Sequence, residues 1–371
     1  MTATEVIKLL RMKLQMKNSL FETRTWRCHQ RHFLPLILLA VCAVTTAAFT
    51  TGCNEEPTVK TTIGTTSTSS TETYQRQAIL YYKGITEPRQ DAWKEMANDA
   101  ERLQHDGFNI VALSPPILIT QRAGGKPRVI LEGAADSVPG ITDELHQAGL
   151  GVFISPTTET AGLEPQLEVS DAILEQLTAD TLQWAETAEE NQAELFSPLA
   201  AYNLALGTET ANIWSAKMLP LVRQKFRGGL VARVVPDINT TVKDAGSVHD
   251  FELLDFKGYD YLMLDIQPHG DTFDPTRFDL EVHELLKHAD VIAQRDGLKG
   301  VLVEFCGWRE KVGVDIVDGP ILGEGGQAVL AERLIQLALP QTSGIFWHGW
   351  TLPGRGARDH MVEGSLRLGW Q

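Results

Sequence analysis

The sequence predicts an α/β protein with a single folded domain, a (β/α)8 TIM barrel over residues 78–371. Short apolar runs rich in β-branched residues alternate along the chain with segments whose apolar residues recur at the helical period. The short runs are apolar throughout rather than alternating, as is typical of parallel strands that helices cover on both faces. The length of this region also fits the ~250 residues that such a barrel usually takes as one domain.

The predicted strands are, in order, residues 78–82, 108–113, 150–154, 193–196, 230–235, 259–264, 300–304 and 344–347. The predicted helices cover 89–105, 136–148, 171–189, 210–226, 280–295 and 326–339, and a short segment at 248–256 precedes the sixth strand. The alternative is an open doubly wound sheet, which would lead us to expect a glycine-rich phosphate loop after the first strand. Residues 82–86 (YKGIT) are no such loop, so we expect a closed barrel.

Residues 1–52 are predicted to be a signal peptide. A basic head leads into an uncharged, mostly apolar run at 34–49, which is the order of regions in a secretory signal. The run ends in Gly52-Cys53, which resembles the lipidation motif of bacterial lipoproteins, although Thr50 stands where that motif usually has Leu. We therefore expect lipidation at Cys53 and an exported, membrane-anchored protein that faces the periplasm or the cell exterior. An uncleaved N-terminal membrane anchor is the alternative, although the apolar run is short for a span.

Residues 53–77 are rich in Ser and Thr and poor in large apolar residues, which predicts a flexible linker. Of the 4 cysteines, only Cys306 lies in the folded domain after Cys53, so we expect no disulfide framework there. The net charge is −15; residues 1–52 carry seven basic and two acidic side chains, so residues 53–371 carry −20. Such an acidic surface repels phosphate backbones and argues against a nucleic-acid partner, but it does not affect neutral sugars.

Candidate site residues are those that end the predicted strands, because active sites of this fold lie at the C-terminal ends of the strands. Glu304 directly follows Val301-Leu302-Val303 at the end of the seventh strand and is the best candidate catalytic carboxylate. A structural carboxylate paired with an Arg or Lys is the alternative for it. Tryptophan faces pack well on sugar rings. The candidates for substrate binding are Tyr82, Trp308, Trp347, His348 and Trp350.

Glu304, followed by Phe305 and Gly307, resembles the nucleophile segment of the retaining β-glycosidases of clan A, which share a (β/α)8 fold. Trp347 resembles the sugar-stacking tryptophan at the end of their eighth strand. The resemblance implies a glycoside hydrolase that acts on extracellular or cell-envelope oligo- or polysaccharide, with Glu304 as nucleophile and without a cofactor.

The second carboxylate of that mechanism is missing from its usual place. A retaining glycosidase needs an acid/base roughly 5 Å from the nucleophile, and clan A places it in an Asn-Glu pair after strand four. Here Ala200-Ala201 stands there. Glu209, directly before the next helix, is the first candidate acid/base. A displaced carboxylate, Asp265 or Glu159, is the second possibility, and a wider separation of ~6.5–9.5 Å would then imply inversion.

Two other functions remain open. If the acid has been lost, the chain is a carbohydrate-binding lipoprotein with little or no hydrolysis. A metal-dependent hydrolase is a further alternative, because Asp265, His269 and Asp271 could bring oxygen and nitrogen ligands together at the end of the sixth strand. The sequence leaves the sugar, its linkage and the oligomeric state undetermined.

Overall fold

The computed structural model describes residues 81–120, 128–131, 133–161, 169–236, 250–268, 273–307, 309–312, 315–318, 322–353 and 356–370. The chain divides into two units, Met1–Glu72 and Thr73–Gln371, and all described residues belong to the second. The predicted signal peptide and the whole of the predicted linker, Cys53 included, lie outside the described residues and stay predictions. Among the helices that are described, none is both long and apolar enough to span a membrane.

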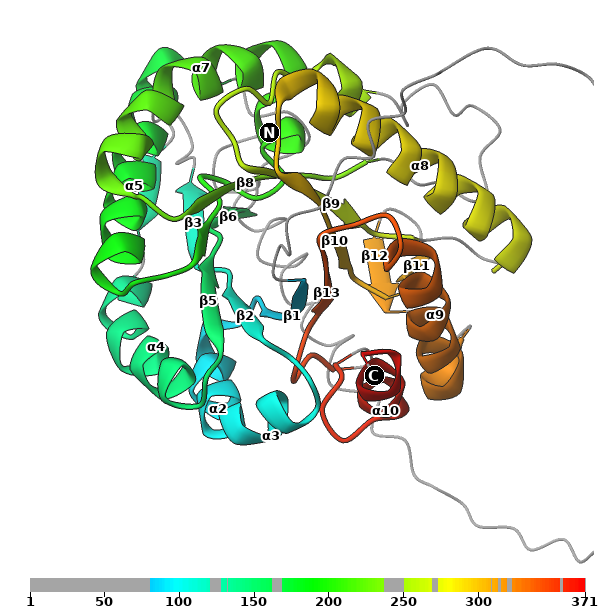
Figure 1. Cartoon of the computed structure of the whole chain (residues 1–371). Coiled ribbons are helices and arrows are strands. Elements are labelled where there is room, and N and C mark those ends of the chain that lie inside the picture. Colours follow the sequence, from blue (N-terminus) through cyan, green and yellow to red (C-terminus); the bar gives the residue numbers. More distant parts are fainter. Residues whose placement is uncertain are drawn as a thin grey trace, which may run out of the picture. The chain divides into compact units, whose positions relative to one another are not determined.

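Eight parallel strands close into a barrel inside a ring of helices (Figure 1), which confirms the predicted fold. Each strand pairs in parallel with its two neighbours around the barrel. The order around the barrel is β1 (Tyr82–Glu87), β13 (Gly344–His348), β10 (Gly300–Phe305), β9 (Tyr261–Ile266), β8 (Gly229–Val234), β7 (Leu195–Phe196), β5 (Gly151–Ile154) and β2 (Ile110–Leu113).

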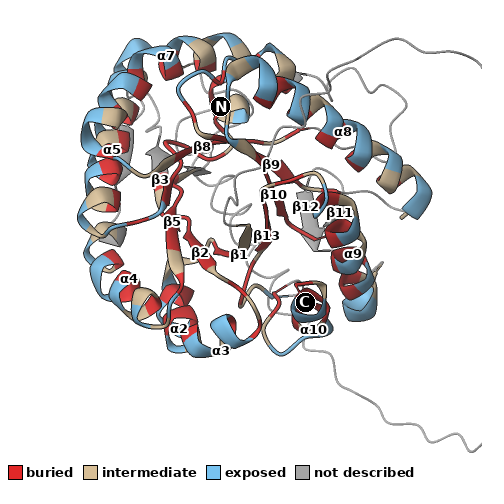
Figure 2. Ribbon diagram, in the orientation of Figure 1, coloured by how far each residue is buried: buried red, intermediate tan, exposed pale blue. Residues whose placement is uncertain are grey.

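The helices are amphipathic and turn their buried faces toward the strands (Figure 2), as the helical period of their apolar residues requires. They are α2 (Trp93–Asn98), α3 (Ala100–His105), α4 (Val138–Gln147), α5 (Asp171–Glu190), α6 (Tyr202–Leu206), α7 (Thr208–Lys225), α8 (Pro275–Asp296), α9 (Gly323–Ala338) and α10 (Met361–Gly369). Three 3₁₀ turns are η1 (Gln90–Ala92), η2 (Gly133–Asp136) and η3 (Asp250–Leu253).

Two buried clusters fill the molecule, one outside the strands and one inside the barrel. The larger packs the outer faces of the strands against the helices. The smaller is formed by inward side chains from the strands, namely Ile110, Ala112, Phe153, Leu195, Val231, Tyr261, Met263, Leu302 and Phe346. Because successive strand residues point to opposite faces, these residues fix which positions face the interior farther along each strand.

The first strand is shifted from its predicted position. β1 begins at Tyr82, where the predicted strand 78–82 ends. The interior is tightly packed beside this strand: Gly84 faces inward, and a Cβ atom there would collide with the ring of Phe346. The predicted helix 89–105 is also interrupted, because Asp99 leaves helical geometry between α2 and α3.

Several elements were not predicted. One is a small three-stranded sheet formed by β4 (Arg128–Leu131), β3 (Pro116–Thr120) and β6 (Thr157–Ala161). Another is the antiparallel pair of β11 (Arg309–Val312) and β12 (Asp315–Asp318). The C-terminal helix α10 packs on α9. Both small sheets follow barrel strands directly and belong to the loops at the C-terminal end of the barrel, where this fold places its active sites.

Candidate active site at the C-terminal end of the barrel

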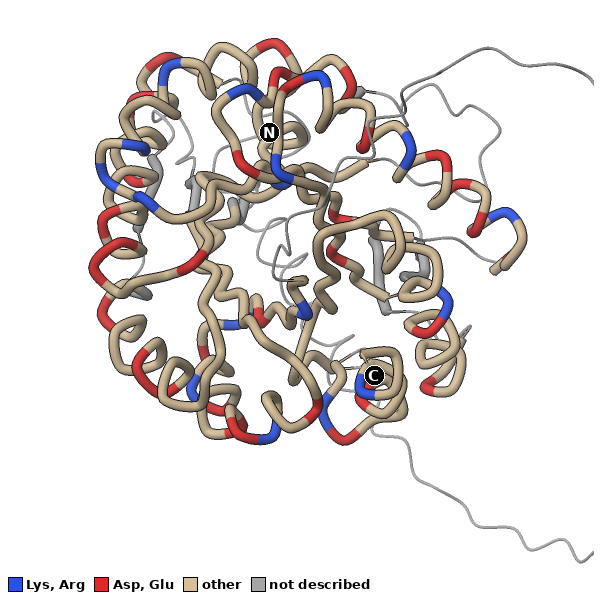
Figure 3. The backbone as a smooth tube through the Cα atoms, in the orientation of Figure 1, with Lys and Arg blue, Asp and Glu red and all other residues tan. Residues whose placement is uncertain are grey.

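A ring of polar side chains lines the barrel interior near the C-terminal ends of its strands. Each member is within one residue of the end of a strand and lies two residues after an inward-facing residue, so it faces the interior too. Figure 3 shows that charged residues otherwise lie mainly on the helices. We call this set the rim ring; from β1, β2, β5, β7, β8, β9, β10 and β13 it comprises Thr86, Ser114, Ser155, Ser197, Arg233, Asp265, Glu304 and His348.

Arg233 is the centre of the rim ring. Its Nη2 atom donates to Asp265 Oδ2 at 2.9 Å and to Glu304 Oε2, its Nε atom donates to Asp265 Oδ1 at 3.3 Å, and its Nη1 atom donates to Ser155 Oγ at 2.7 Å. The side chains of Arg233, Asp265 and Glu304 are 4%, 5% and 0% exposed. Charges buried this deeply are stable only when they are paired and hydrogen-bonded. The planar guanidinium can serve both carboxylates at once because its donors form a fork.

Glu304 is held as an ionised carboxylate with both oxygens engaged. Its Oε1 atom lies 2.6 Å from His348 Nδ1, while Oε2 accepts from Arg233. Burial alone would raise the pKa of Glu304, but the charges of Arg233 and His348 outweigh it and hold that pKa well below the usual range. Burial would lower the pKa of His348, but Cys306 and Glu304 raise it to about 10. At neutral pH the pair is therefore a carboxylate bonded to an imidazolium.

Asp265 is the neighbour of Glu304 and titrates differently. The two residues face each other directly in the register of β9 and β10. Burial is the largest cause that raises the pKa of Asp265. The charge of Glu304 adds to the increase, whereas the charge of Arg233 opposes it.

Glu304, Asp265 and His348 lie at one end of the barrel, as the sequence predicted. Their catalytic or binding roles stay predictions.

Three of the predicted aromatic residues lie outside the barrel mouth, which corrects their predicted position beside the opening. Trp347 is 1% exposed and faces the helix layer, where its ring packs 5.5 Å from that of Phe305. Trp350 is fully buried, and its Nε1 atom donates to Asp99 Oδ2 at 2.8 Å. Tyr82 begins β1 instead of ending it, so it lies at the opposite end of the barrel, with its ring edge-on to that of Tyr261.

The predicted orientation of Trp347 is wrong by one position along the strand. Phe346 and His348 face the interior, so Trp347 between them must face outward. The predicted place of Tyr82 at the end of the first strand is wrong because the strand begins four residues later than the apolar pattern indicates. Among the described residues, polar groups line the space inside the rim, and neither Trp347 nor Trp350 is one of them.

Of the candidate acid/base residues, Asp265 is the neighbour of Glu304, whereas Glu209 is not brought to it. Glu209 is an exposed residue in the first turn of α7, in the outer ring of helices. Ala200 and Ala201 do follow β7 as predicted: Ala200 forms a bridge to Thr157, and Ala201 has a left-handed φ of 53°. Glu159 lies in β6, where its backbone pairs with Leu118.

The remaining predicted residues, Trp308, His269 and Asp271, lie outside the described residues. Among the residues that the structure describes, no group of three or more His, Cys, Asp or Glu side chains is arranged to hold a metal ion. Asp265, the third residue of the metal hypothesis, is paired with Arg233.

Arg233, Cys306 and the hydroxyl residues of the rim ring were not among the predicted site residues. Arg233 had a readable signal, because a single charge inside the apolar run 230–235 must find buried partners. The hydroxyl groups of Thr86, Ser114 and Ser197 are buried and make no hydrogen bond to any described residue. Buried hydroxyl groups normally have partners, so these three can bond to a polar ligand that enters the rim.

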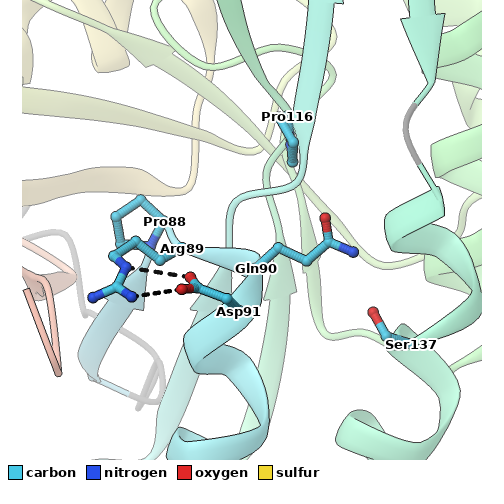
Figure 4. A pocket seen from close by; sticks show the side chains of 6 residues that line it. All are labelled: Pro88, Arg89, Gln90, Asp91, Pro116 and Ser137. Carbon is cyan, nitrogen blue, oxygen red and sulfur yellow. Dashed lines mark hydrogen bonds and ion pairs between the residues drawn. The ribbon is translucent and has the colours of Figure 1, made fainter.

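A separate surface pocket opens beside the same end of the barrel (Figure 4). Pro88 follows β1 directly and Pro116 begins β3, which places the pocket outside the rim ring. Arg89 and Asp91 form an ion pair of 2.6 Å on one side, and Gln90 extends in the direction of Ser137. No member of the rim ring lines this pocket, so it could contact only a ligand that reaches beyond the rim.

Comparison with known proteins gives a likeness in structure alone. No family model matches the sequence, and no curated protein sequence matches it. A GH113 β-1,4-mannanase aligns over 78% of this chain and 99% of its own, with 15% identity and a TM-score of 0.56. The GH113 β-mannanase AaManA from Alicyclobacillus acidocaldarius aligns over 79% and 97%, with 14% identity and a TM-score of 0.58. PbGH5A, a glycoside hydrolase family 5 enzyme from Prevotella bryantii, aligns over 80% and 98%, with 14% identity and a TM-score of 0.54. At such identities the likeness shows a shared barrel fold.

Replacement of Trp347 tests its place in the helix layer. We expect Trp347→Ala to lower the free energy of unfolding by about 3–5 kcal/mol, because it removes a fully packed ring. Trp347→Phe should lose less and should leave oligosaccharide affinity unchanged. Urea unfolding and calorimetric titration measure the two quantities. A Phe variant with wild-type stability and clearly weaker oligosaccharide binding would show that Trp347 contacts the ligand after all.

Replacement of Arg233 tests the buried ion cluster. Arg233→Met leaves two buried carboxylates without their cation, so we expect a loss of about 3–5 kcal/mol in the free energy of unfolding. The added changes Glu304→Gln and Asp265→Asn should restore part of it. The matched control is Lys287→Met, which breaks an exposed 3.6 Å pair with Glu284 and should cost less than about 1 kcal/mol. Equal losses for the two single variants in urea unfolding would contradict the cluster's role.

Proposed function

We propose that the protein binds oligosaccharide inside the rim ring, at the C-terminal end of its barrel. The rim ring carries the proposal: it offers hydroxyl, carboxylate, guanidinium and imidazole groups around one opening. Sugar hydroxyls both donate and accept hydrogen bonds, so they match such a mixed set. The unpartnered hydroxyls of Thr86, Ser114 and Ser197 are the groups with bonds left to make. The acidic surface does not oppose a neutral ligand.

The structural neighbours are consistent with this ligand class. PbGH5A was solved with a xyloglucan tetradecasaccharide, and a GH5 protein named ZgEngAGH5_4, similar over 79% of this chain with a TM-score of 0.53, was solved with cellotriose. We further propose, from the signal-like residues 1–52 and Cys53, that binding takes place outside the cytoplasm on a membrane-anchored lipoprotein.

The surroundings of Glu304 favour binding over efficient cleavage of glycosidic bonds. A nucleophilic carboxylate must reach the anomeric carbon while a second carboxyl group protonates the leaving oxygen. Both oxygens of Glu304 already have partners, and its side chain is 0% exposed. Ala200-Ala201 offers no acid, and Glu209 faces solvent on the outer ring.

Glycoside hydrolysis is a second candidate, and one observation favours it. The raised pKa of Asp265 means that this carboxyl group can carry a proton beside the ionised Glu304, which is the division of roles that a glycosidase uses. It ranks second because both groups bind the same nitrogen of Arg233, whereas a glycosidase places the sugar between its two carboxyl groups.

Binding and cleavage can be measured on one panel of variants. We expect the wild type to bind manno-, xylogluco- or cello-oligosaccharides and to release no sugar from them or from aryl glycosides. Ser197→Ala should weaken binding about 2- to 10-fold, because a hydrogen bond typically contributes 0.5–1.5 kcal/mol. The control is Thr187→Val, whose hydroxyl bonds to the backbone of its own helix α5.

Binding of none of these glycans would contradict the proposed function. Efficient release of sugar that disappears in Glu304→Gln and Asp265→Asn would instead establish the second candidate, with Glu304 and Asp265 in the predicted roles.

A further inference from the structure

Cys306 lies in the opening formed by the rim ring, next to His348. Leu302 and Glu304 face the interior, so Cys306, two residues farther along the same chain segment, faces it as well. Phe305 of β10 pairs with Trp347 of β13, so Cys306 and His348 are the next neighbours across these two strand ends. The thiol is 3% exposed and hydrogen-bonds with the imidazole ring.

His348 connects this thiol to Glu304. One ring nitrogen, Nδ1, lies 2.6 Å from Glu304 Oε1, so the ring is oriented by a carboxylate that Arg233 fixes in turn. A thiol, an imidazole and an orienting carboxylate in this sequence of contacts form the arrangement that activates a nucleophile in cysteine- and serine-dependent acyl transfer. His348 is 17% exposed, so the thiol–imidazole pair borders the opening of the barrel and not its sealed core.

A hydrogen-bond donor stands on the other side of His348. Thr86 of β1 pairs with His348 in the barrel register and faces the interior. Its side chain is fully buried, and its hydroxyl makes no hydrogen bond to any residue that the structure describes. A buried donor beside a nucleophile and its base is placed to bind an oxygen atom that gains negative charge during the reaction.

We propose that Cys306 is the nucleophile of an acyl-ester hydrolase, with His348 as acid/base, Glu304 as the residue that positions His348 and Thr86 as donor to the carbonyl oxygen. The substrate class is an acyl ester carried on a hydroxyl of bound carbohydrate, and this choice of alcohol rests on the proposed function. A thiolate attacks a trigonal carbonyl carbon, which an ester has and a glycosidic bond lacks. Cleavage of an ester by this cluster therefore does not require the second carboxyl group that a glycosidase uses as its acid.

The reaction balances within these residues and water. The Cys306–His348 pair reacts with its shared proton on the imidazole, as thiolate and imidazolium. The thiolate sulfur forms a bond to the carbonyl carbon, the ester C–O bond breaks, and the leaving sugar oxygen takes the proton of the His348 imidazolium. Neutral His348 then removes a proton from water, the resulting hydroxide attacks the thioester carbon, and the C–S bond breaks to release the acid and the thiolate. The net change is ester plus water to alcohol plus carboxylic acid.

The test measures ester hydrolysis by the full chain on p-nitrophenyl acetate and on an O-acetylated oligosaccharide. We expect activity on both, and a loss of at least about 100-fold in Cys306→Ala and in His348→Gln. Glu304→Gln should lower kcat at least about tenfold while KM stays within about twofold, which a general loss of structure would not produce. Thermal unfolding of each variant confirms that it folds, and Thr187→Val is the control for an ordinary substitution.

Mass spectrometry of the peptide that contains Cys306 gives an independent measurement, because it separates this residue from the cysteines near the N-terminus. The wild type treated briefly with p-nitrophenyl acetate should carry one acetyl group on Cys306, and His348→Gln should not. Wild-type ester hydrolysis by Cys306→Ala, or no acetylation of Cys306, would overturn the proposal. Hydrolysis of the aryl ester alone would overturn carbohydrate esters as its substrates. Oligosaccharide binding is measured separately, so its absence would count against the proposed function and not against the thiol chemistry.

Discussion

Arg233 is a buried cation on which the C-terminal end of the barrel depends. It binds two carboxylates on β9 and β10, to one side of β8, and the serine hydroxyl that follows β5, to the other side. Removing such a charge from water is costly and is offset only by several well-placed partners. The arginine therefore holds Glu304 and Asp265 in fixed positions, and Glu304 holds His348.

This constraint changes what Glu304 can do. A catalytic carboxylate in a glycosidase must be free to bond to a sugar carbon, but here each of its oxygens already has a charged partner. The same contacts make Glu304 well suited to orient an imidazole. A residue that resembles a nucleophile in sequence can thus serve as a positioning group when its neighbours differ, and site chemistry must be argued from those neighbours and not from the fold.

The barrel could be predicted from the sequence because its strands and helices have distinct patterns. The orientation of residues within the strands could not. A strand covered on both faces is apolar throughout and has no alternation to show which residues face inward. Trp347 and His348 are adjacent in the chain, and only the packed interior around Phe346 reveals that the histidine faces the site and the tryptophan does not.

Other parts of the site can be recognised in the sequence only when the residues that they contact are known. The position of Glu304 was predicted because it is a lone carboxylate after an apolar strand, and Arg233 carried a similar signal that only its buried partners explain. Cys306 was recognised as a thiol without a disulfide framework, but its neighbour His348 is more than forty residues away in the chain. Contacts between residues so far apart in the chain depend on the order of the strands around the barrel, which the sequence pattern does not show.

The protonation state of His348 tests the central claim most directly, because it depends on an ionised Glu304 held by Arg233. Nuclear magnetic resonance of the full chain with 15N-labelled histidine reports both ring nitrogens, and the spectrum of His348→Gln assigns the signal. The account predicts that both nitrogens of His348 carry protons up to at least about pH 8, since its pKa is raised to about 10. A His348 ring that loses its proton near the ordinary value of ~6.5 would contradict it.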